Sequence, residues 1–346
     1  MQTLSQTNKP VALWLFGMCA IIALMVVVGG ATRLTDSGLS IVEWRPVTGA
    51  VPPLGEADWL AEFEKYQAIP EYEQVNWGMS LAEFKKIYWW EWGHRFLGRL
   101  IGIAFLLPLI FFAATKRIDR DLGWKLGGLF ILGGAQGALG WWMVSSGLSE
   151  RVDVSQYRLA AHLGLAVALF AAMLWIALDL VSSRRAKPEP LAPFAAAFAV
   201  GVYLQMILGA FVAGLRAGRT FNTWPLMDGR IFPDGYFSGE PGLNDLFETA
   251  AASQFNHRLG AYALAIAAIF LFASARKTGV RGRARLVLAA VFLQIALGVW
   301  TVLAATPVAL GLAHQGGALI VFAAALFLVH GCSRSIEMRL SSSRAA

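Results

Sequence analysis

The sequence predicts an all-α integral membrane protein, in which eight transmembrane helices form two parallel-repeat four-helix bundles. Composition gives the first indication. Of 346 residues, 57% are hydrophobic and only 15% are charged, whereas soluble domains are about 25% charged. The second is the grouping of apolar residues into eight stretches, each near the roughly 20 residues that a helix needs to cross a bilayer. Because a helix satisfies its own backbone groups in lipid, these stretches predict helices.

The eight spans follow one another with two long interruptions. In chain order we expect them at residues 11–32, 95–114, 123–145, 158–181, 192–214, 257–275, 284–305 and 310–331. The first span is too long for a removable signal peptide and lacks a small-residue cleavage site, so we expect it to be retained. The long outer loops are 33–90 and 215–256, and short amphipathic stretches are expected near 59–66 and 81–87 within the first. The remaining connections are short, which predicts antiparallel neighbours.

The chain has a net charge of +7, and its basic and acidic residues concentrate on opposite sides of the expected spans. Basic residues follow spans 2, 4, 6 and 8: Lys116, Arg117, Arg120, Lys125, Arg184, Arg185, Lys187, Arg276, Lys277, Arg281, Arg283, Arg285, Arg334, Arg339 and Arg344. Acidic residues concentrate in the first long loop: Glu56, Asp58, Glu62, Glu64, Glu71 and Glu73. The positive-inside rule therefore places both termini in the cytoplasm, and the sorting indicates a membrane protein with no nucleic-acid partner. Cys19 and Cys332 are too far apart to suggest a structural disulfide.

The chain repeats internally. The letters QGALGWW at 136–142 resemble QIALGVW at 294–300, and WRPVTG at 44–49 resembles WPLMDG at 224–229. Each half holds four spans, so an axis along the membrane normal would relate the halves. We expect an N-terminal half at 1–181, a cytoplasmic linker at 182–190 and a C-terminal half at 191–346.

Glycine pairs are frequent inside the spans: Gly29-Gly30, Gly127-Gly128, Gly133-Gly134 and Gly316-Gly317. Small residues let membrane helices approach closely. They could also leave room for a flat cofactor, and both interpretations stay open.

Four histidines mark the starts of spans 2, 4, 6 and 8: His94, His162, His257 and His314. A histidine within a membrane span is costly and usually functional. Alternate helices run in the same direction, so His94 can face His162, and His257 can face His314, across one cavity in each half. Zinc prefers a tetrahedral set with cysteine or carboxylate ligands, and copper is an alternative. Haem supplies four nitrogens itself and needs only axial ligands, so two histidines fit haem iron best.

The two halves differ three residues before the first histidine of each. Glu91 precedes His94, whereas Gln254 precedes His257. A residue at i−3 shares the histidine's helix face, and a carboxylate can take a proton or orient water, which an amide cannot. Glu91 is therefore either a catalytic group or a helix-start carboxylate favoured by the helix dipole. Arg95 and Arg258, directly after the histidines, could hold haem propionates or act as ordinary helix-end charges.

With these residues, the sequence resembles the haem A synthase family, in its cysteine-free type of Proteobacteria and mitochondria. The resemblance covers nearly the whole chain. It implies oxidation of the C8 methyl of haem O to a formyl group via hydroxylated intermediates. It assigns the substrate haem to His94 and His162 and a b-type haem to His257 and His314. It also implies that Glu91 is catalytic and that electrons leave through the b-type haem.

The same resemblance implies the surroundings of the protein. Expected partners are haem O, the lipid bilayer, a haem O synthase and an electron acceptor that the sequence does not identify; a homo-oligomer is also compatible. We expect a multi-pass protein of the bacterial inner membrane, with the haem sites toward the periplasm. Two alternatives stay open: a di-haem b-type electron-transfer protein and a haem transporter or chaperone. Haem O and haem A extracted alongside haem B would favour the synthase.

Overall fold

The computed structural model describes residues 9–182, 189–237, 242 and 245–333, which fold almost entirely into helices. Eight of the described helices have 23 residues or more: α1 (Lys9–Leu34), α4 (Leu81–Ala114), α5 (Arg120–Ser145), α6 (Gln156–Val181), α7 (Ala192–Gly214), α9 (Ala250–Ser274), α10 (Arg281–Leu303) and α11 (Val308–Ser333). Shorter helices lie in the connections: η1 (Thr48–Ala50), α2 (Glu56–Gln67), α3 (Pro70–Gln74), η2 (Ala217–Arg219), α8 (Asp245–Glu248) and η3 (Ala275–Lys277).

Seven of the described helices are long and apolar enough to cross a membrane, so the chain is an all-α membrane protein. The exception among the eight long helices is α5. Its apolar part is rich in glycine and contains Gln136, which lowers its mean hydropathy. The prediction of eight membrane crossings is therefore supported for seven helices.

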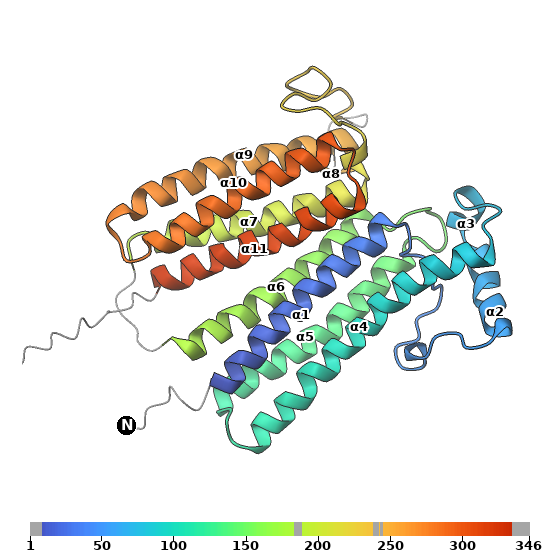
Figure 1. Ribbon diagram of the computed structural model, residues 1–346, viewed down its shortest axis with the longest axis horizontal. Coiled ribbons are helices and arrows are strands. Elements are labelled where there is room, and N and C mark those ends of the chain that lie inside the picture. The colour runs from blue at the N-terminus through green and yellow to red at the C-terminus, as the bar shows by residue number, and fades with distance from the viewer. Residues whose placement is uncertain (1–8, 183–188, 238–241, 243–244, 334–346) are drawn as a thin grey trace, which may run out of the picture.

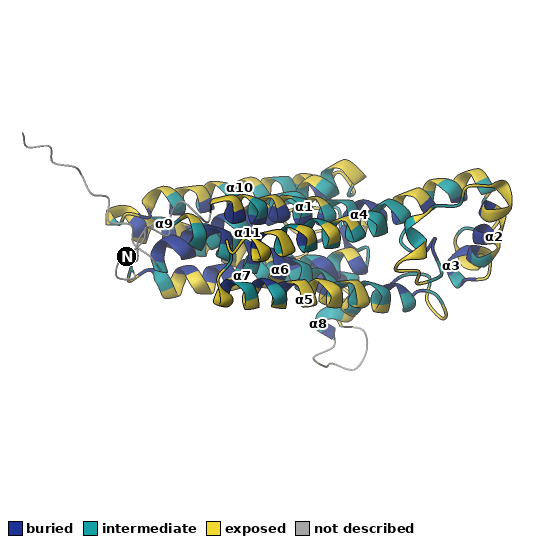
Figure 2. Ribbon diagram, turned by 90° about the horizontal axis from the view of Figure 1, so that it is seen from below, coloured by how far each residue is buried: buried dark blue, intermediate teal, exposed yellow. Residues whose placement is uncertain are grey.

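The long helices lie in two groups (Figure 1): α1, α4, α5 and α6 in one, and α7, α9, α10 and α11 in the other. Between the groups, α1 and α6 pack against α7 and α11. These four helices bury the largest apolar cluster, which includes Leu15, Val167, Phe198 and Leu328. Figure 2 shows buried residues on the sides of the helices that face one another and exposed residues along the outward faces. Those faces carry large apolar side chains such as Ile103, Ile131 and Ile266, as expected for surfaces that contact lipid.

Two helices begin earlier than the hydrophobic pattern predicts. Helix α4 begins at Leu81 rather than near 95, because Ser80 and Glu83 form a capping box. Helix α9 begins at Ala250, where the Thr249 side chain accepts a hydrogen bond from the Ala252 N–H. Apolarity detects only the part of a helix immersed in lipid. The expected outer loop 33–90 was therefore too long: it ends at 80, and the stretch at 81–87 is the first part of α4.

The first outer connection folds into a small domain, the outer cap, made of α2, α3 and the first turns of α4. The amphipathic stretch at 59–66 is confirmed as part of α2. Its apolar face packs with α3 and α4 around Phe84, whose side chain is fully buried. The rings of Phe63 and Tyr66 have centroids 5.0 and 5.3 Å from that of Phe84. No comparable cluster of buried aromatic rings occurs in the described part of the second connection.

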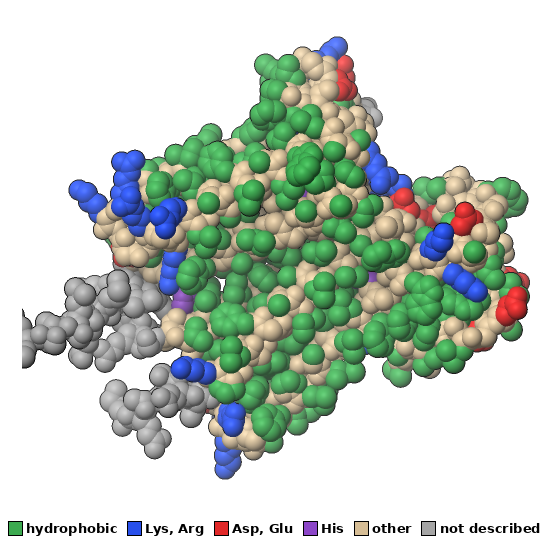
Figure 3. All heavy atoms as spheres, in the orientation of Figure 1, with side chains coloured by type: hydrophobic (Ala, Val, Ile, Leu, Met, Phe, Trp, Pro, Cys, Tyr) green, Lys and Arg blue, Asp and Glu red, His purple; other side chains and the backbone are tan. Residues whose placement is uncertain are grey.

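Charge separates along the long axis of the molecule (Figure 3). Lysines and arginines gather without visible acidic residues at the end opposite the outer cap, whereas acidic and basic residues lie together at the end that holds it. Six members of the basic set, and most of the expected linker, lie outside the described residues: Arg184, Arg185, Lys187, Arg334, Arg339 and Arg344. Cys19 and Cys332 are both buried and free.

Candidate functional site

The four histidines lie inside their helices, not at the helix starts. His94 is 13 residues beyond Leu81, and the other three are six or seven residues beyond the starts of α6, α9 and α11. In α4 and α9 the residues before the histidine are more polar, so apolarity placed the start of those two spans at the histidine. All four histidines therefore belong to regular helix, where the backbone fixes the direction of each ring.

The second-half pair is brought together as predicted. The rings of His257 and His314 have centroids 6.3 Å apart and planes 79° apart. Imidazoles that bind one metal ion from opposite sides, each nitrogen about 2.0–2.1 Å away, place their ring centroids roughly 6 Å apart. The separation of the pair is compatible with two imidazoles on opposite sides of one ion. Among the described residues, no group of three or more His, Cys, Asp or Glu side chains could hold a metal ion.

In the first half, His94 belongs to α4 and His162 to α6. Both rings lie in the space between α1, α4, α5 and α6. Each of the four histidines faces a glycine of the preceding long helix. A Cβ atom at Gly29 would lie 3.0 Å from His94 Nε2, and one at Gly140 would lie 2.9 Å from His162 Cε1. In the second half, a Cβ at Gly209 would lie 3.3 Å from His257, and one at Gly298 would lie 2.7 Å from His314.

The glycine pairs singled out in the sequence thus have different surroundings. Gly29 makes room for a histidine, and Gly30 for the side chain of Gln315. By contrast, a Cβ at Gly127, Gly128, Gly133 or Gly134 would have no neighbour within 4 Å. Close packing within the described chain therefore explains the Gly29-Gly30 pair of α1 but not the two glycine pairs of α5.

Three glutamines contact the histidines, and sequence reasoning missed them. The Gln136 Nε2 lies 3.1 Å from His162 Nδ1, and equal distances separate Gln205 from His257 and Gln294 from His314. Each amide also donates to the backbone oxygen of its histidine, at 2.9, 2.7 and 2.7 Å respectively. A signal was present in the sequence: each glutamine stands four residues before the glycine that faces its histidine, and 136–142 was one of the noted repeats.

Glu91 lies one turn from His94 and is only 3% exposed. One carboxylate oxygen accepts from the Ser40 hydroxyl and the Ile41 N–H, each at 2.8 Å. The other accepts from Arg95 Nε and Nη2 at 3.0 and 2.6 Å. Glu91 is not at a helix start, because α4 begins ten residues earlier, so the interpretation as a helix-dipole carboxylate was wrong. The carboxylate holds the entry of the outer connection against α4.

Gln254 occupies the equivalent place in α9 and is 2% exposed. Its Nε2 donates to the backbone oxygens of Ala217 and Phe221 at 2.9 and 3.2 Å. Its Oε1 accepts from Arg258 Nη2 at 3.0 Å. Gln254 therefore anchors the second outer connection in the way that Glu91 anchors the first.

The two arginines predicted at the propionates have protein partners. Arg95 also donates to the backbone oxygens of Ile41 and Glu43, at 2.7 and 2.9 Å. Arg258 donates to those of Phe221 and Leu226, at 3.1 and 3.4 Å. These contacts favour a loop-anchoring role for both guanidinium groups.

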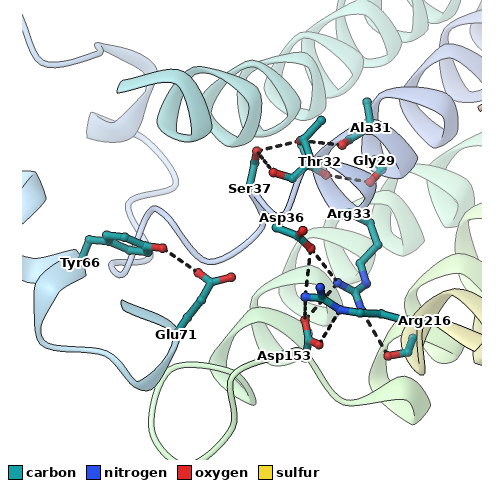
Figure 4. Close-up of polar contacts among 12 residues, drawn as sticks. Gly29, Ala31, Thr32, Arg33, Asp36, Ser37, Tyr66, Glu71, Asp153 and Arg216 are labelled. Carbon is teal, nitrogen blue, oxygen red and sulfur yellow. Dashed lines mark hydrogen bonds and ion pairs between the residues drawn. The ribbon is translucent and has the colours of Figure 1, made fainter. Parts of the chain in front are cut away.

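An ionic cluster joins the two halves near their outer ends (Figure 4). The Asp153 carboxylate accepts from Arg33 of α1 and from Arg216, which follows α7, with N–O distances of 3.0 Å. Arg216 also lies 3.0 Å from Asp36. Nearby in the outer cap, the Tyr66 hydroxyl donates to Glu71 at 3.2 Å. Burial raises the pKa of the Glu71 carboxyl to about 8; the Tyr66 bond opposes this shift, and the charge of Glu91 adds to it.

Comparison with known proteins agrees with this architecture. Residues 12–326 match the model of the COX15-CtaA family, described as cytochrome oxidase assembly protein. A protein of Parvibaculum lavamentivorans named heme A synthase is 54% identical over 324 residues, 93% of this chain and 94% of the relative. Heme A synthases of Nitrosospira multiformis and Caulobacter vibrioides are 49% and 50% identical, covering 94% and 93% of this chain and 94% and 95% of their own. The chain therefore belongs to the COX15-CtaA family of cytochrome oxidase assembly proteins.

Proposed function

We propose that this protein is a haem A synthase, which converts haem O to haem A by oxidising the C8 methyl group to a formyl group. The observation that carries the proposal is the similarity to proteins named heme A synthase, at 49–54% identity over more than nine tenths of the chain. The reaction would pass through the alcohol and the gem-diol, which loses water to give the aldehyde. The four histidines in a duplicated bundle are compatible with this activity.

In the proposed division of labour, the second half holds a resident b-type haem between His257 and His314. The support is their ring separation of 6.3 Å, which suits axial ligation. When bound, this haem would supply a one-electron redox centre for electrons on their way to an acceptor. The histidines would provide the axial nitrogens, and the glycines opposite them would admit the rings.

The first half would hold the substrate haem O through His94 and His162. Glu91, one turn from His94, would be the catalytic carboxylate that accepts a proton or orients water beside the methyl group. Its four hydrogen-bond donors would keep the carboxylate in one orientation. Because Arg95 and Arg258 already donate to loop carbonyls, we propose that both act mainly by shaping the outer connections, with propionate binding as a second role.

We further propose that α5 is the eighth crossing, since it lies alongside α4 and α6 and has the length of a spanning helix (Figure 1). Both termini would then be cytoplasmic and the haem sites would lie toward the periplasm of a bacterial inner membrane. The basic end of the molecule (Figure 3) supports this orientation. Residues 182–190 would form the cytoplasmic connection between the halves.

Haem extraction after expression with a source of haem O tests the activity. We expect haem O and haem A to be recovered alongside haem B from the purified protein, and haem A to appear only when the protein is present. Haem B alone would instead identify an electron-transfer protein. Weakly held haem O that is never oxidised would identify a transporter or chaperone.

A further inference from the structure

Three of the four histidines share one arrangement, which involves residues outside the proposed ligand set. At each of these three histidines, the amide nitrogen of one glutamine contacts both the ring Nδ1 and the histidine's own backbone oxygen. The glutamines come from α5, α7 and α10, the helices that carry the facing glycines. The same geometry at three repeat-related positions indicates a function common to all three amides.

The orientation of the amide affects which ring nitrogen is left for a ligand. In each contact the amide nitrogen faces Nδ1 at 3.1 Å, and the Gln136 nitrogen also lies 3.5 Å from His162 Nε2. With the amide nitrogen as donor, the ring proton is on Nε2. A histidine that binds metal through Nε2 carries its proton on Nδ1, and that N–H is normally held by a hydrogen-bond acceptor. The side-chain oxygens of Gln136 and Gln205 are buried and have no hydrogen-bond partner. Rotation of the amide about its last torsion would bring this oxygen to Nδ1, and would give up the hydrogen bond from the amide nitrogen to the histidine's backbone oxygen.

In the second half, the side-chain amide of each glutamine packs against a glycine. The Gln205 oxygen lies against Gly260 and the Gln294 oxygen against Gly317, so that a Cβ at either glycine would overlap the amide. Each of these glycines is three residues beyond its histidine. In the first half, Leu165 takes the position that corresponds to them beside His162.

Among the residues that the structure describes, no glutamine amide contacts His94 in this way. The residue four before its facing glycine, Gly29, is Met25, whose Cε lies 3.4 Å from a Cβ placed at Gly98. A thioether is at most a weak acceptor and cannot donate to a backbone oxygen. His94 also presents Nε2 to Gly29, whereas His162 and His314 present Cε1 to theirs.

We propose that Gln136, Gln205 and Gln294 are positioning residues for the axial imidazoles, and that Met25 leaves His94 unsupported so that the first-half haem can exchange. This proposal rests on the proposed function, which assigns the resident haem to the second half and the substrate to the first. A site with both ligands supported retains its haem, whereas a site with one unsupported ligand can release its product.

The test on the second half uses the purified protein with its b-type haem. We expect Gln205→Leu and Gln294→Leu each to speed transfer of this haem to excess apomyoglobin by about 10- to 100-fold, the usual effect of losing an outer-shell partner. Gln→Leu should raise the midpoint potential of the haem, because the imidazole loses its acceptor and becomes a weaker donor to ferric iron. Gln205→Glu should lower the potential, because a carboxylate is a stronger acceptor. A purely structural role would not give shifts of opposite sign.

Gln315 provides the matched control. It is adjacent to His314 in sequence, but its Nε2 donates to the backbone oxygen of Val26 at 3.0 Å. Gln315→Leu therefore removes an interhelical amide bond without touching a histidine, and should leave the haem potential unchanged. Equal shifts in Gln315→Leu and Gln205→Leu, or shifts of the same sign in the Leu and Glu variants, would overturn the proposal.

Met25→Gln tests the first half by supplying the missing amide. We expect haem O loaded into this variant to transfer to apomyoglobin at least about tenfold more slowly than from the unmodified protein, with no change in the potential of the b-type haem. Unchanged or faster transfer would contradict the role assigned to Met25. Haem A formation by the unmodified protein is measured in parallel: its absence would refute the proposed function, while the potential shifts would still test the glutamines.

Discussion

Glu91 and Gln254 occupy equivalent positions in the two halves and perform the same structural task with opposite hydrogen-bond polarity. The carboxylate of Glu91 only accepts: the first connection presents it with an N–H and a hydroxyl, and Arg95 of α4 adds its guanidinium. The amide of Gln254 donates to two carbonyl oxygens of the second connection. The backbone of each connection is therefore complementary to one side chain. Exchange of the two is not conservative, although their shapes are similar.

This comparison changes how a variant at position 91 must be interpreted. An amide there would place an NH₂ group among four donors. Loss of activity could follow from a displaced connection as well as from a missing base. The decisive variant therefore needs a control that weakens the same anchor while keeping the carboxylate.

The largest effect is expected for Glu91→Gln, which makes the first half resemble the second. A general base typically contributes about a hundred- to ten-thousand-fold to rate, so haem A output should fall at least about a hundredfold while haem O binding and the b-type haem persist. Ser40→Ala is the control, because it removes one donor to Glu91 and keeps the carboxylate. We expect it to lower output less than about tenfold. Similar losses in both variants would assign Glu91 to anchoring alone.

The outer connections should differ in stability. Phe84→Ala empties a fully buried position in the aromatic cluster of the outer cap, and large-to-small changes of this kind cost about 3–5 kcal/mol. Phe232, in the second connection, is 48% exposed, so Phe232→Ala should cost less than about 1 kcal/mol. Hydrogen exchange of the two connections in detergent would measure this. Equal losses of hydrogen-exchange protection in Phe84→Ala and Phe232→Ala would show that the second connection is as firmly packed as the first.

A smaller, pH-dependent effect is expected at Glu71. Its pKa of about 8 exceeds that of an unfolded glutamate, about 4.3. Between these values the unfolded state binds fewer protons, so the contribution of Glu71 becomes less favourable as pH rises from about 4 to 8 and is then constant. Glu71→Gln should remove this trend. Compared with the unmodified protein, the variant cap should be more stable at pH 8 than at pH 5 by on the order of 2–4 kcal/mol. The measurement is the free energy of cap unfolding as a function of pH. The same slope in the unmodified protein and in Glu71→Gln would contradict the prediction.

Much of the fold could be predicted from the sequence because long apolar stretches identify membrane helices. Prediction failed where apolarity is uninformative. The first turns of α4 are polar, and a capping box at Ser80 sets the true beginning. The glycines and Gln136 in the apolar part of α5 lower its hydropathy.

For the site, the histidine pairing followed from repeat spacing. The contacts of Gln136, Gln205 and Gln294 depend on how neighbouring helices are rotated, which periodicity does not give. Likewise, the protein partners of Arg95 and Arg258 come from loop carbonyls, and no sequence pattern encodes the position of those carbonyls.

The central claim is that the second half retains a haem while the first half transforms one. The most direct measurement is the b-type haem spectrum and the extracted haem composition of four single variants. His257→Ala and His314→Ala should each lose the b-type haem, because an axial ligand is removed. His94→Ala and His162→Ala should keep that spectrum and yield no haem A. Equal loss of b-type haem in all four variants would contradict the division of labour between the halves.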